Sequence, residues 1–360
     1  MSGIMMQLLG SGAGGSGGGS YLALNRKSSG VLTVADHTSA GSISSLSTIQ
    51  IGGGGNDGYS CQWSSDDSFI VATTEGSPHL HLIDSSNVSS LSSTDNIDIG
   101  FRSRGIALSP DDSYIAVGHW NSNTGTVPQI KIYSISSGSL SLSNTYTPDG
   151  GNAAGAIESL DFSPDGNYLA IFGRAQNNSN GYVWLYSHSS GSLTFVASYD
   201  GGHNTHSTGG GCVRFSPDGT YIACAMQAKL KVFSYNSSSI TEITSENVPA
   251  GSIWQGGCNW KFDGSEIAAI TSGGTYTRRL YLYTWSGSNL SLTSSYYVMP
   301  ATSYGFAWSP DGKYIAASCD TSSKSLVLID VSDSDNISEV DHISGNGFYT
   351  TGDRIDFSHN

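Results

Sequence analysis

Charged side chains are scarce in this chain: Asp, Glu, Lys and Arg together make up 12% of its 360 residues. Basic residues are the scarcer kind, with 15 Lys and Arg against 29 Asp and Glu, and the formal net charge is −14 at pH 7. Nucleic acids and anionic membranes are bound through basic patches. We therefore predict no nucleic-acid partner and no membrane insertion.

Long apolar runs and paired cysteines are also missing. No segment approaches the roughly 18 consecutive apolar residues that a transmembrane helix needs. The cysteines contain no CxxC pair and no disulfide-like spacing, and they are Cys61, Cys212, Cys224, Cys258 and Cys319. We interpret them as small buried side chains, which favours folding in a reducing compartment.

What the chain has in abundance is one motif: an aromatic residue, Ser-Pro-Asp-Gly, one variable residue, then Tyr, Ile or Leu, and Ala. Three clear copies cover residues 162–170, 215–223 and 308–316. Weaker copies start at Trp63, Leu108 and Trp260. A repeat spaced by about 40–50 residues indicates a ring or array of one supersecondary unit.

The two ends of the chain hold the halves of a further copy. Residues 356–360 match the start of the motif and stop at the turn, while residues 19–24 match residues 219–224, which follow the turn in another copy. A closed ring would pair the two ends and remove exposed sheet edges. Six complete copies and one split copy predict seven blades.

Each copy also predicts four strands. In the third copy they cover residues 157–162, 168–173, 181–186 and 193–198. Over about residues 20–360 the chain resembles seven-bladed β-propellers of the WD-repeat-like superfamily. It lacks that family's Trp-Asp and in-register Gly-His dipeptides, so the family's hydrogen-bonded tetrad is not expected here. The resemblance implies an all-β ring over residues 19–360, with four antiparallel strands per blade and one blade closed by both termini.

Patterns for catalysis or cofactor binding are weak throughout. The glycine strings at 52–55, 209–211 and 256–257 lack the Lys and the following helix of a phosphate loop. Two histidine pairs, His79 with His81 and His203 with His206, lack further ligands at metal-site spacing. We predict no catalytic residue, no metal and no cofactor, and we expect that the chain is not an enzyme.

Polar residues interrupt the apolar first strands at one register, directly before the marker aromatic. The seven positions are Gln62, Ala107, Asp161, Arg214, Asn259, Ala307 and Asp356. We expect these side chains to line the central channel. Two interpretations stay open: hydrogen bonds and ion pairs between blades, or a site for a small ligand or ion.

Aromatic residues and arginines in the loops are candidate anchors for a partner, because such residues dominate interface energetics. Arg102, Trp254 and Tyr304 are expected on one face of the ring, and Trp120 on the opposite face.

The segment 1–18 is a short apolar run on a Gly/Ser-rich stretch and lacks the basic start of a signal peptide. It is interpreted either as a frayed tail or as a docking peptide. The docking contacts would be made by Ile4, Met5, Met6, Leu8 and Leu9. The first ten residues resemble the start of small tail and appendage proteins of marine tailed phages.

These features favour a non-enzymatic interaction module, a structural component of a phage virion tethered by its N-terminal peptide. Its partners would be other virion or scaffold proteins, or a host-surface glycan. The expected location is the virion, made in the host cytoplasm, with the bacterial cytoplasm or cell surface as the alternative. Two other functions stay open: a lectin-like propeller adhesin that binds carbohydrate, and a channel-mouth enzyme such as a lactonase.

Overall fold

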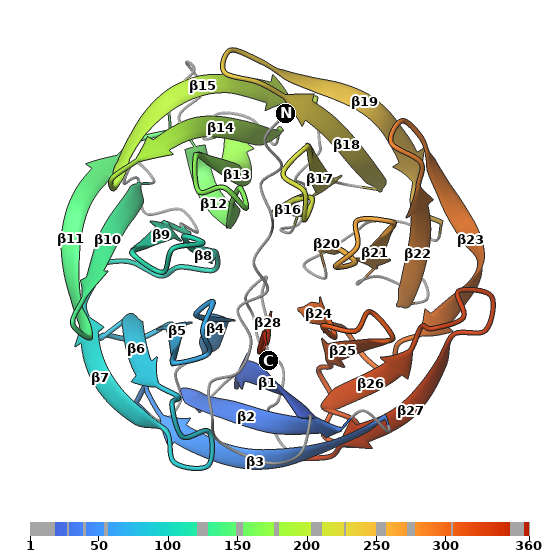
Figure 1. Ribbon diagram of the computed structural model, residues 1–360, viewed down its shortest axis with the longest axis horizontal. Helices are drawn as coiled ribbons and strands as arrows, with labels where there is room; N and C mark the ends of the chain where they lie inside the picture. The colour runs from blue at the N-terminus through green and yellow to red at the C-terminus, as the bar shows by residue number, and fades with distance from the viewer. Residues whose placement is uncertain are drawn as a thin grey trace, which may run out of the picture.

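The described part of the chain forms seven sheets of four antiparallel strands, arranged as a ring around a central axis (Figure 1). The structure is a computed structural model that describes residues 19–26, 29–38, 41–53, 57–120, 129–148, 154–175, 180–202, 211–226, 228–249, 257–271, 278–303, 305–345 and 356–359. The predicted all-β, seven-bladed propeller is confirmed. No helix in these residues has the length and hydropathy to cross a bilayer.

Every blade runs from an inner strand at the axis to an outer strand at the rim. The inner strands are β28 (Asp356–Phe357), β4 (Gly58–Trp63), β8 (Ile106–Leu108), β12 (Ala154–Phe162), β16 (Gly211–Phe215), β20 (Cys258–Trp260) and β24 (Phe306–Trp308). The second strands are β1 (Gly19–Asn25), β5 (Phe69–Thr74), β9 (Tyr114–Gly118), β13 (Tyr168–Ala175), β17 (Tyr221–Met226), β21 (Glu266–Ile270) and β25 (Tyr314–Ser318). We number the blades 1 to 7 in this order.

The third strands are β2 (Val31–Thr38), β6 (Leu80–Asp84), β10 (Ile130–Ser136), β14 (Gly181–Ser189), β18 (Lys229–Tyr235), β22 (Arg279–Trp285) and β26 (Leu326–Asp330). The outer strands are β3 (Ser42–Gln50), β7 (Ser92–Ile97), β11 (Ser139–Tyr146), β15 (Ser192–Asp200), β19 (Ile240–Asn247), β23 (Leu290–Val298) and β27 (Ser338–Ile343).

Blade 1 is built from both ends of the chain, as the split copy predicts. Strand β28 pairs with β1, with Phe357 opposite Leu22. The backbone N–H of Tyr21 donates to Ser358 Oγ at 2.8 Å, and the N–H of Ser358 donates to the Tyr21 carbonyl at 2.7 Å. Complete copies that keep the turn serine make the same pair of bonds within one hairpin, as Ser163 and Tyr168 do, so the termini take the place of a turn.

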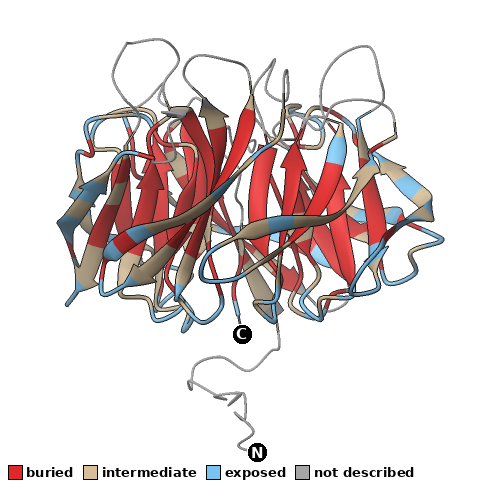
Figure 2. Ribbon diagram, turned by 90° about the horizontal axis from the view of Figure 1, so that it is seen from above, coloured by how far each residue is buried: buried red, intermediate tan, exposed pale blue. Residues whose placement is uncertain are grey.

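Burial decreases from the axis to the rim (Figure 2). All five residues of β16 are buried, because inner strands lie between neighbouring sheets. The outer strand β11 has mostly exposed positions, with Leu140 buried and Leu142 51% exposed. The inner strands therefore hold the packed core, and the outer strands face solvent on one side.

The Ser-Pro-Asp-Gly segments are hydrogen-bonded turns that join inner to second strands. In blade 4, Ser163 Oγ donates to Asp165 Oδ1 at 2.5 Å and accepts the N–H of Tyr168 at 2.9 Å. Gly166 has a φ of +72°, a conformation that glycine adopts without steric cost. The side of the ring that carries these turns is called the turn face, and the other side the loop face.

Candidate functional site at the channel mouth

A cavity of about 440 Å³ lies where the central channel meets the turn face. It combines the polar register of the inner strands with aromatic rings from blades 1, 5, 6 and 7. Its lining residues are Asp161, Pro164, Arg214, Phe215, Pro217, Asn259, Trp260, Phe262, Phe306, Ala307, Trp308, Asp356, Phe357, Ser358 and His359. The chain therefore brings four of the five polar channel residues singled out from the sequence into one cavity.

Three residues of the polar register hold neighbouring blades together. Asp161 accepts the backbone N–H of Phe215 at 2.8 Å, and Asp356 accepts that of Trp63 at 3.1 Å. Gln62, which lies outside the cavity lining, accepts the N–H of Leu108 at 3.0 Å. Each bond joins one inner strand to the next blade, so these side chains have a structural use.

The side chains of Arg214 and Asn259 differ in their hydrogen bonds to the rest of the protein. Arg214 is 6% exposed, and its Nη1 donates to Ser159 Oγ at 2.8 Å and to the Val213 carbonyl at 2.7 Å. The half-buried carboxamide of Asn259 makes no hydrogen bond to any residue that the structure describes, whereas its backbone carbonyl accepts one from Trp308 Nε1 at 3.2 Å. An amide offers both donors and acceptors, so Asn259 is the polar group in the cavity best suited to a ligand.

The turn of blade 6 breaks the repeat at three places beside this cavity. Lys261 stands where the other copies have Ser, Phe262 where four of them have Pro, and Glu266 where the others have Tyr or Phe. Lys261 Nζ lies 2.7 Å from Glu266 Oε2 and 5.7 Å from the centre of the Trp308 ring. The hydrogen bond from the Gly264 N–H to the Lys261 carbonyl, 2.9 Å, is kept. An ion pair thus replaces the serine bonds without changing the turn.

This substitution leaves Phe262 exposed. In regular copies the proline packs on the glycine of the next blade's turn, as Pro164 does on Gly219, where an added Cβ would lie 3.5 Å from Pro164 Cδ. At Gly312 an added Cβ would instead meet Lys261 Cε at 2.9 Å. Lys261 has taken over the contact between blades 6 and 7, and Phe262 is 58% exposed at the cavity. The departure from the repeat at residues 261–266 was visible in the sequence, but its position at the channel mouth was not.

His359 adds a titratable group to the cavity and a bond to blade 2. Its backbone N–H donates to Asp67 Oδ1 at 2.8 Å, and its Nδ1 lies 3.1 Å from the same oxygen. Burial works to lower the pKa of His359, but the hydrogen bond with Asp67 and the charges of Asp356 and Asp112 outweigh it and raise the pKa. Asp67, with φ +59°, stands where regular turns have glycine. A non-glycine residue in this left-handed conformation is strained, but its side chain provides the bond to His359 in the C-terminal segment.

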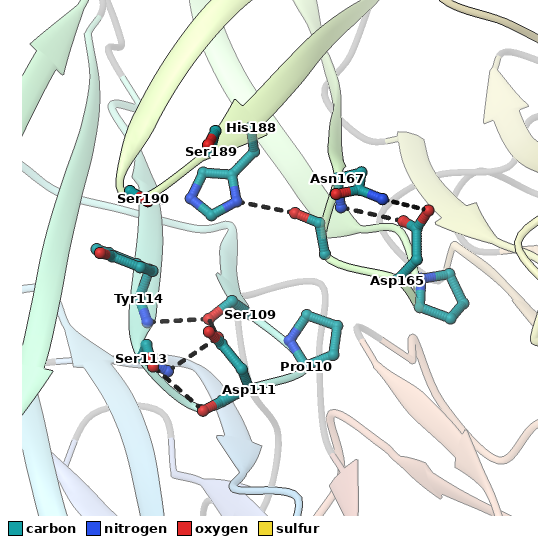
Figure 3. Close-up of a pocket in the computed structure, with 12 residues that line it drawn as sticks. Ser109, Pro110, Asp111, Ser113, Tyr114, Asp165, Asn167, His188, Ser189 and Ser190 are labelled. Carbon is teal, nitrogen blue, oxygen red and sulfur yellow. Dashed lines mark hydrogen bonds between the residues drawn. The ribbon is translucent and has the colours of Figure 1, made fainter. Parts of the chain in front are cut away.

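A second cavity on the turn face, about 490 Å³, lies between blades 3 and 4 (Figure 3). His188 Nδ1 lies 2.8 Å from the Gly166 carbonyl, and its Nε2 accepts the N–H of Gly191 at 3.2 Å. Asp111 and Asp165 accept bonds from within their own turns, from Ser113 and Asn167 among others. Both ring nitrogens and both carboxylates thus serve the local structure, and we assign no ligand here.

On the loop face, two of the residues singled out as partner anchors lie together. The backbone N–H of Trp120 donates to the Arg102 carbonyl at 2.9 Å. The prediction that Trp120 lies on the face opposite Arg102 is therefore wrong, because loops entering a blade and loops between second and third strands leave from the same strand ends. Arg102 pairs with Glu75 at 2.7 Å, and the Trp120 ring lies 3.8 Å from the Arg104 guanidinium carbon.

Other predicted anchors lie outside the described residues. They are Trp254, Tyr304 and the N-terminal set Ile4, Met5, Met6, Leu8 and Leu9. His203 and His206 lie outside them too. His81 is buried, with Nε2 3.2 Å from Thr74 Oγ1, and burial lowers its pKa to about 4.

Comparison with known protein families finds one match, which is confined to a short segment. The family described as WD domain, G-beta repeat, matches residues 197–234, which include the inner hairpin of blade 5. The chain is a seven-bladed β-propeller that contains one segment similar to a WD repeat. No curated protein matches its sequence.

Solved structures share this propeller ring over most of its length. A putative 6-phosphogluconolactonase from Bacteroides uniformis has a TM-score of 0.74 at 13% identity, covering 94% of this chain and 99% of that one. The periplasmic gluconolactonase of Pseudomonas aeruginosa has a TM-score of 0.74 at 15% identity, with the same coverage. The Swd1 propeller domain of Myceliophteria thermophila has a TM-score of 0.60 at 12% identity, covering 83% of this propeller and 89% of its own chain.

These likenesses correct the expectation that the chain is not an enzyme. Two of the similar structures are described as lactonases, so a propeller ring of this shape accommodates catalysis. The expectation rested on missing sequence motifs, and a propeller site assembles from loops and strand ends of several blades, which leaves no local motif. At 13% and 15% identity the likeness shows the fold, and the lactonase descriptions belong to those proteins.

Proposed function

We propose that this propeller is an interaction module that binds a carbohydrate group of its partner in the channel-mouth cavity. The observation that carries the proposal is the pairing of Phe262, 58% exposed, with the Asn259 carboxamide in one cavity. The cavity volume, about 440 Å³, falls in the range of roughly 300–1,000 Å³ common for small-ligand sites.

The chemistry of the lining fits a sugar ring. A pyranose has an apolar C–H face that packs on an aromatic ring, and hydroxyls that need both donors and acceptors. Phe262 supplies an accessible ring, and Asn259 supplies an amide that no described residue occupies. Trp260 and Trp308, both nearly buried, hold the wall rigid behind them. Rigid walls lower the entropy cost of binding.

The charges of the cavity favour a neutral ligand. Asp161 and Asp356 are opposed by Arg214 and by His359, whose pKa is raised. A sialic acid or a phosphorylated sugar would meet carboxylates within the cavity, and a polyamine would meet the guanidinium. Neutral hexoses avoid both repulsions.

The virion assignment is a finer proposal that rests on other residues. Its support is the likeness of the first ten residues to phage tail and appendage proteins, and segment 1–18 lies outside the described residues. A carbohydrate site would suit attachment to a host surface, because a host-surface glycan was among the predicted partners.

A glycan array probed with the full-length chain tests the proposal. We expect binding to neutral hexose-containing glycans, and at least a tenfold weaker Kd for Phe262→Pro, which restores the regular turn while removing the ring. Asn259→Ala should weaken binding comparably.

Two matched controls separate the cavity from the rim. Leu142→Ala removes a side chain of similar exposure, 51%, from the outer strand β11, and Asn247→Ala removes an exposed amide from β19. Both should bind like the parent chain. The proposal is overturned if no neutral glycan binds, or if Phe262→Pro binds as well as the parent while its melting curve is unchanged.

A further inference from the structure

Two buried cysteines meet between blades 5 and 6. Cys212 of β16 and Cys258 of β20 have their Sγ atoms 3.0 Å apart, and the side chains are 0% and 2% exposed. The backbone N–H of Cys258 donates to Cys212 Sγ at 2.6 Å. A disulfide bond is about 2.05 Å long, so a shift of roughly 1 Å would join the two sulfurs.

The backbone next to Cys258 is shaped to admit the sulfur of Cys212. Gly257 has a φ of +71°, and an added Cβ there would lie 3.1 Å from Cys212 Sγ. A larger residue at position 257 would therefore both strain the backbone and push the sulfurs apart. Inner strands of neighbouring blades converge on the axis, which brings residues 46 positions apart in the sequence into contact.

We propose that Cys212 and Cys258 form a redox-modification site, at which hydrogen peroxide converts the two thiols into a disulfide that joins blades 5 and 6. This inference is independent of the carbohydrate proposal. It does, however, concern the same wall of the channel, because Arg214 and Asn259 lie on the same two strands.

The reaction balances with one peroxide molecule. One thiolate attacks a peroxide oxygen, the O–O bond breaks, and a sulfenic acid and water form after protonation. The second thiol attacks the sulfenic sulfur, the S–S bond forms and a second water leaves. The two sulfurs together lose two electrons, which reduce the peroxide, and both thiol protons end in water.

A small oxidant suits this site better than a bulky one. Both sulfurs are enclosed, so a disulfide such as oxidised glutathione cannot reach them without opening of the blades. Burial raises the pKa of the Cys258 thiol, with the neighbouring Cys212 acting in the same direction. The thiolate is the reacting species, so oxidation should be slow at neutral pH and faster as the pH rises.

The bond would fasten the ring at one blade boundary. Trp260 Nε1 already donates to the Arg214 carbonyl across this boundary at 3.2 Å. A disulfide closes a long loop in the unfolded chain and so reduces its conformational entropy. The oxidised protein should therefore melt at a higher temperature than the reduced one, and added reductant should reverse the shift.

Peptide mapping of the intact chain tests the proposal. The reduced protein is freed of reductant, treated with hydrogen peroxide at pH 8.5, digested without reduction and analysed by mass spectrometry. We expect one cross-linked peptide pair containing Cys212 and Cys258, two hydrogens lighter than the sum of the free peptides. We also expect a rise of several degrees in Tm that dithiothreitol removes.

The third buried thiol of this region provides the control. Cys224 lies on β17 and its pKa is likewise raised by burial, so Cys224→Ala should keep the cross-link. Cys258→Ala should abolish both the cross-link and the Tm rise. If the parent chain instead yields free thiols, isolated sulfinic acids or a Cys212–Cys224 link, the proposal fails, whether or not the Cys258→Ala variant folds.

Discussion

The turns of blade 4 and blade 6 have the same backbone but different chemistry. In blade 4, Ser163 bridges Asp165 and the N–H of Tyr168, and Pro164 packs on the next turn. In blade 6, the Lys261–Glu266 ion pair and the stem of Lys261 take over these contacts. The repeat motif is thus a structural element that can be replaced as a unit.

Because Lys261 makes the contact with the next blade, position 262 of blade 6 no longer has that structural role. In regular turns the proline packs on the next blade's turn, whereas blade 6 presents Phe262 to the cavity. A residue that departs from the repeat and has its structural contact supplied by a neighbour is a candidate for function. This comparison is the basis of the carbohydrate proposal, and it can be tested without a ligand.

The largest expected effect comes from breaking the ion pair of blade 6. Lys261→Ala leaves the 8%-exposed Glu266 without its cation, which should cost about 2–3 kcal/mol, because an uncompensated charge near the core is strongly unfavourable. The double variant Lys261→Ser, Glu266→Tyr restores the serine and tyrosine of the regular motif and should recover most of this loss. Denaturant unfolding measures both. Equal stability of Lys261→Ala and the parent chain would show that the pair does not replace the serine bonds.

A smaller effect is expected from the serine of a regular turn. Ser163→Ala removes the acceptor for the Tyr168 N–H at a buried site, which should cost about 1–2 kcal/mol. The comparison variant in blade 6 is Ser265→Ala, where the serine is exposed and its hydroxyl donates to Asp263. We expect less than about 0.5 kcal/mol there, as for surface substitutions generally. Urea unfolding measures both changes. A similar loss in free energy of unfolding for the two variants would contradict the expected difference between the two turns.

The smallest effect concerns the copy in which Asp67 replaces the turn glycine. The pKa of His359 is raised in the folded state, so its contact with Asp67 stabilises the fold at a pH below the ordinary histidine value of about 6.5. This contribution is lost as the pH rises through the folded pKa. Asp67→Gly restores the regular residue and should lower the pKa of His359 in an NMR titration. An unchanged midpoint would mean that Asp356 and Asp112 suffice.

The fold was predictable because its signal is repeated along the chain. Six complete copies and one split copy implied seven blades, and the pairing of β28 with β1 confirmed the split. The register of the polar channel residues was also readable, since each precedes a marker aromatic in the sequence. The hydrogen-bond partners of these side chains could not be predicted, because Asp161 and Asp356 bond to residues of neighbouring blades.

Contacts between blades were the part that sequence reasoning missed. Trp120 was placed on the wrong face, because the relation between two kinds of loop depends on strand direction within the sheet. Cys212 and Cys258 carry no disulfide-like spacing, yet the ring brings their sulfurs to 3.0 Å. Lys261 and Glu266 lie within one hairpin, so their pairing could have been inferred from the joint departure of two positions from the repeat.

The sequence by itself determined the blade number, the strands, the turns and the closure of the ring, because these depend on local turn chemistry and on a pattern repeated at short range. Only the tertiary structure decided which departures from the repeat come together. Closing seven blades around an axis places Asn259, Phe262 and His359 in one cavity and Cys212 beside Cys258. His359 lies on a different blade from Asn259 and Phe262, and Cys212 and Cys258 lie on neighbouring blades. Their distances are set by packing at the crowded axis, which no local pattern encodes.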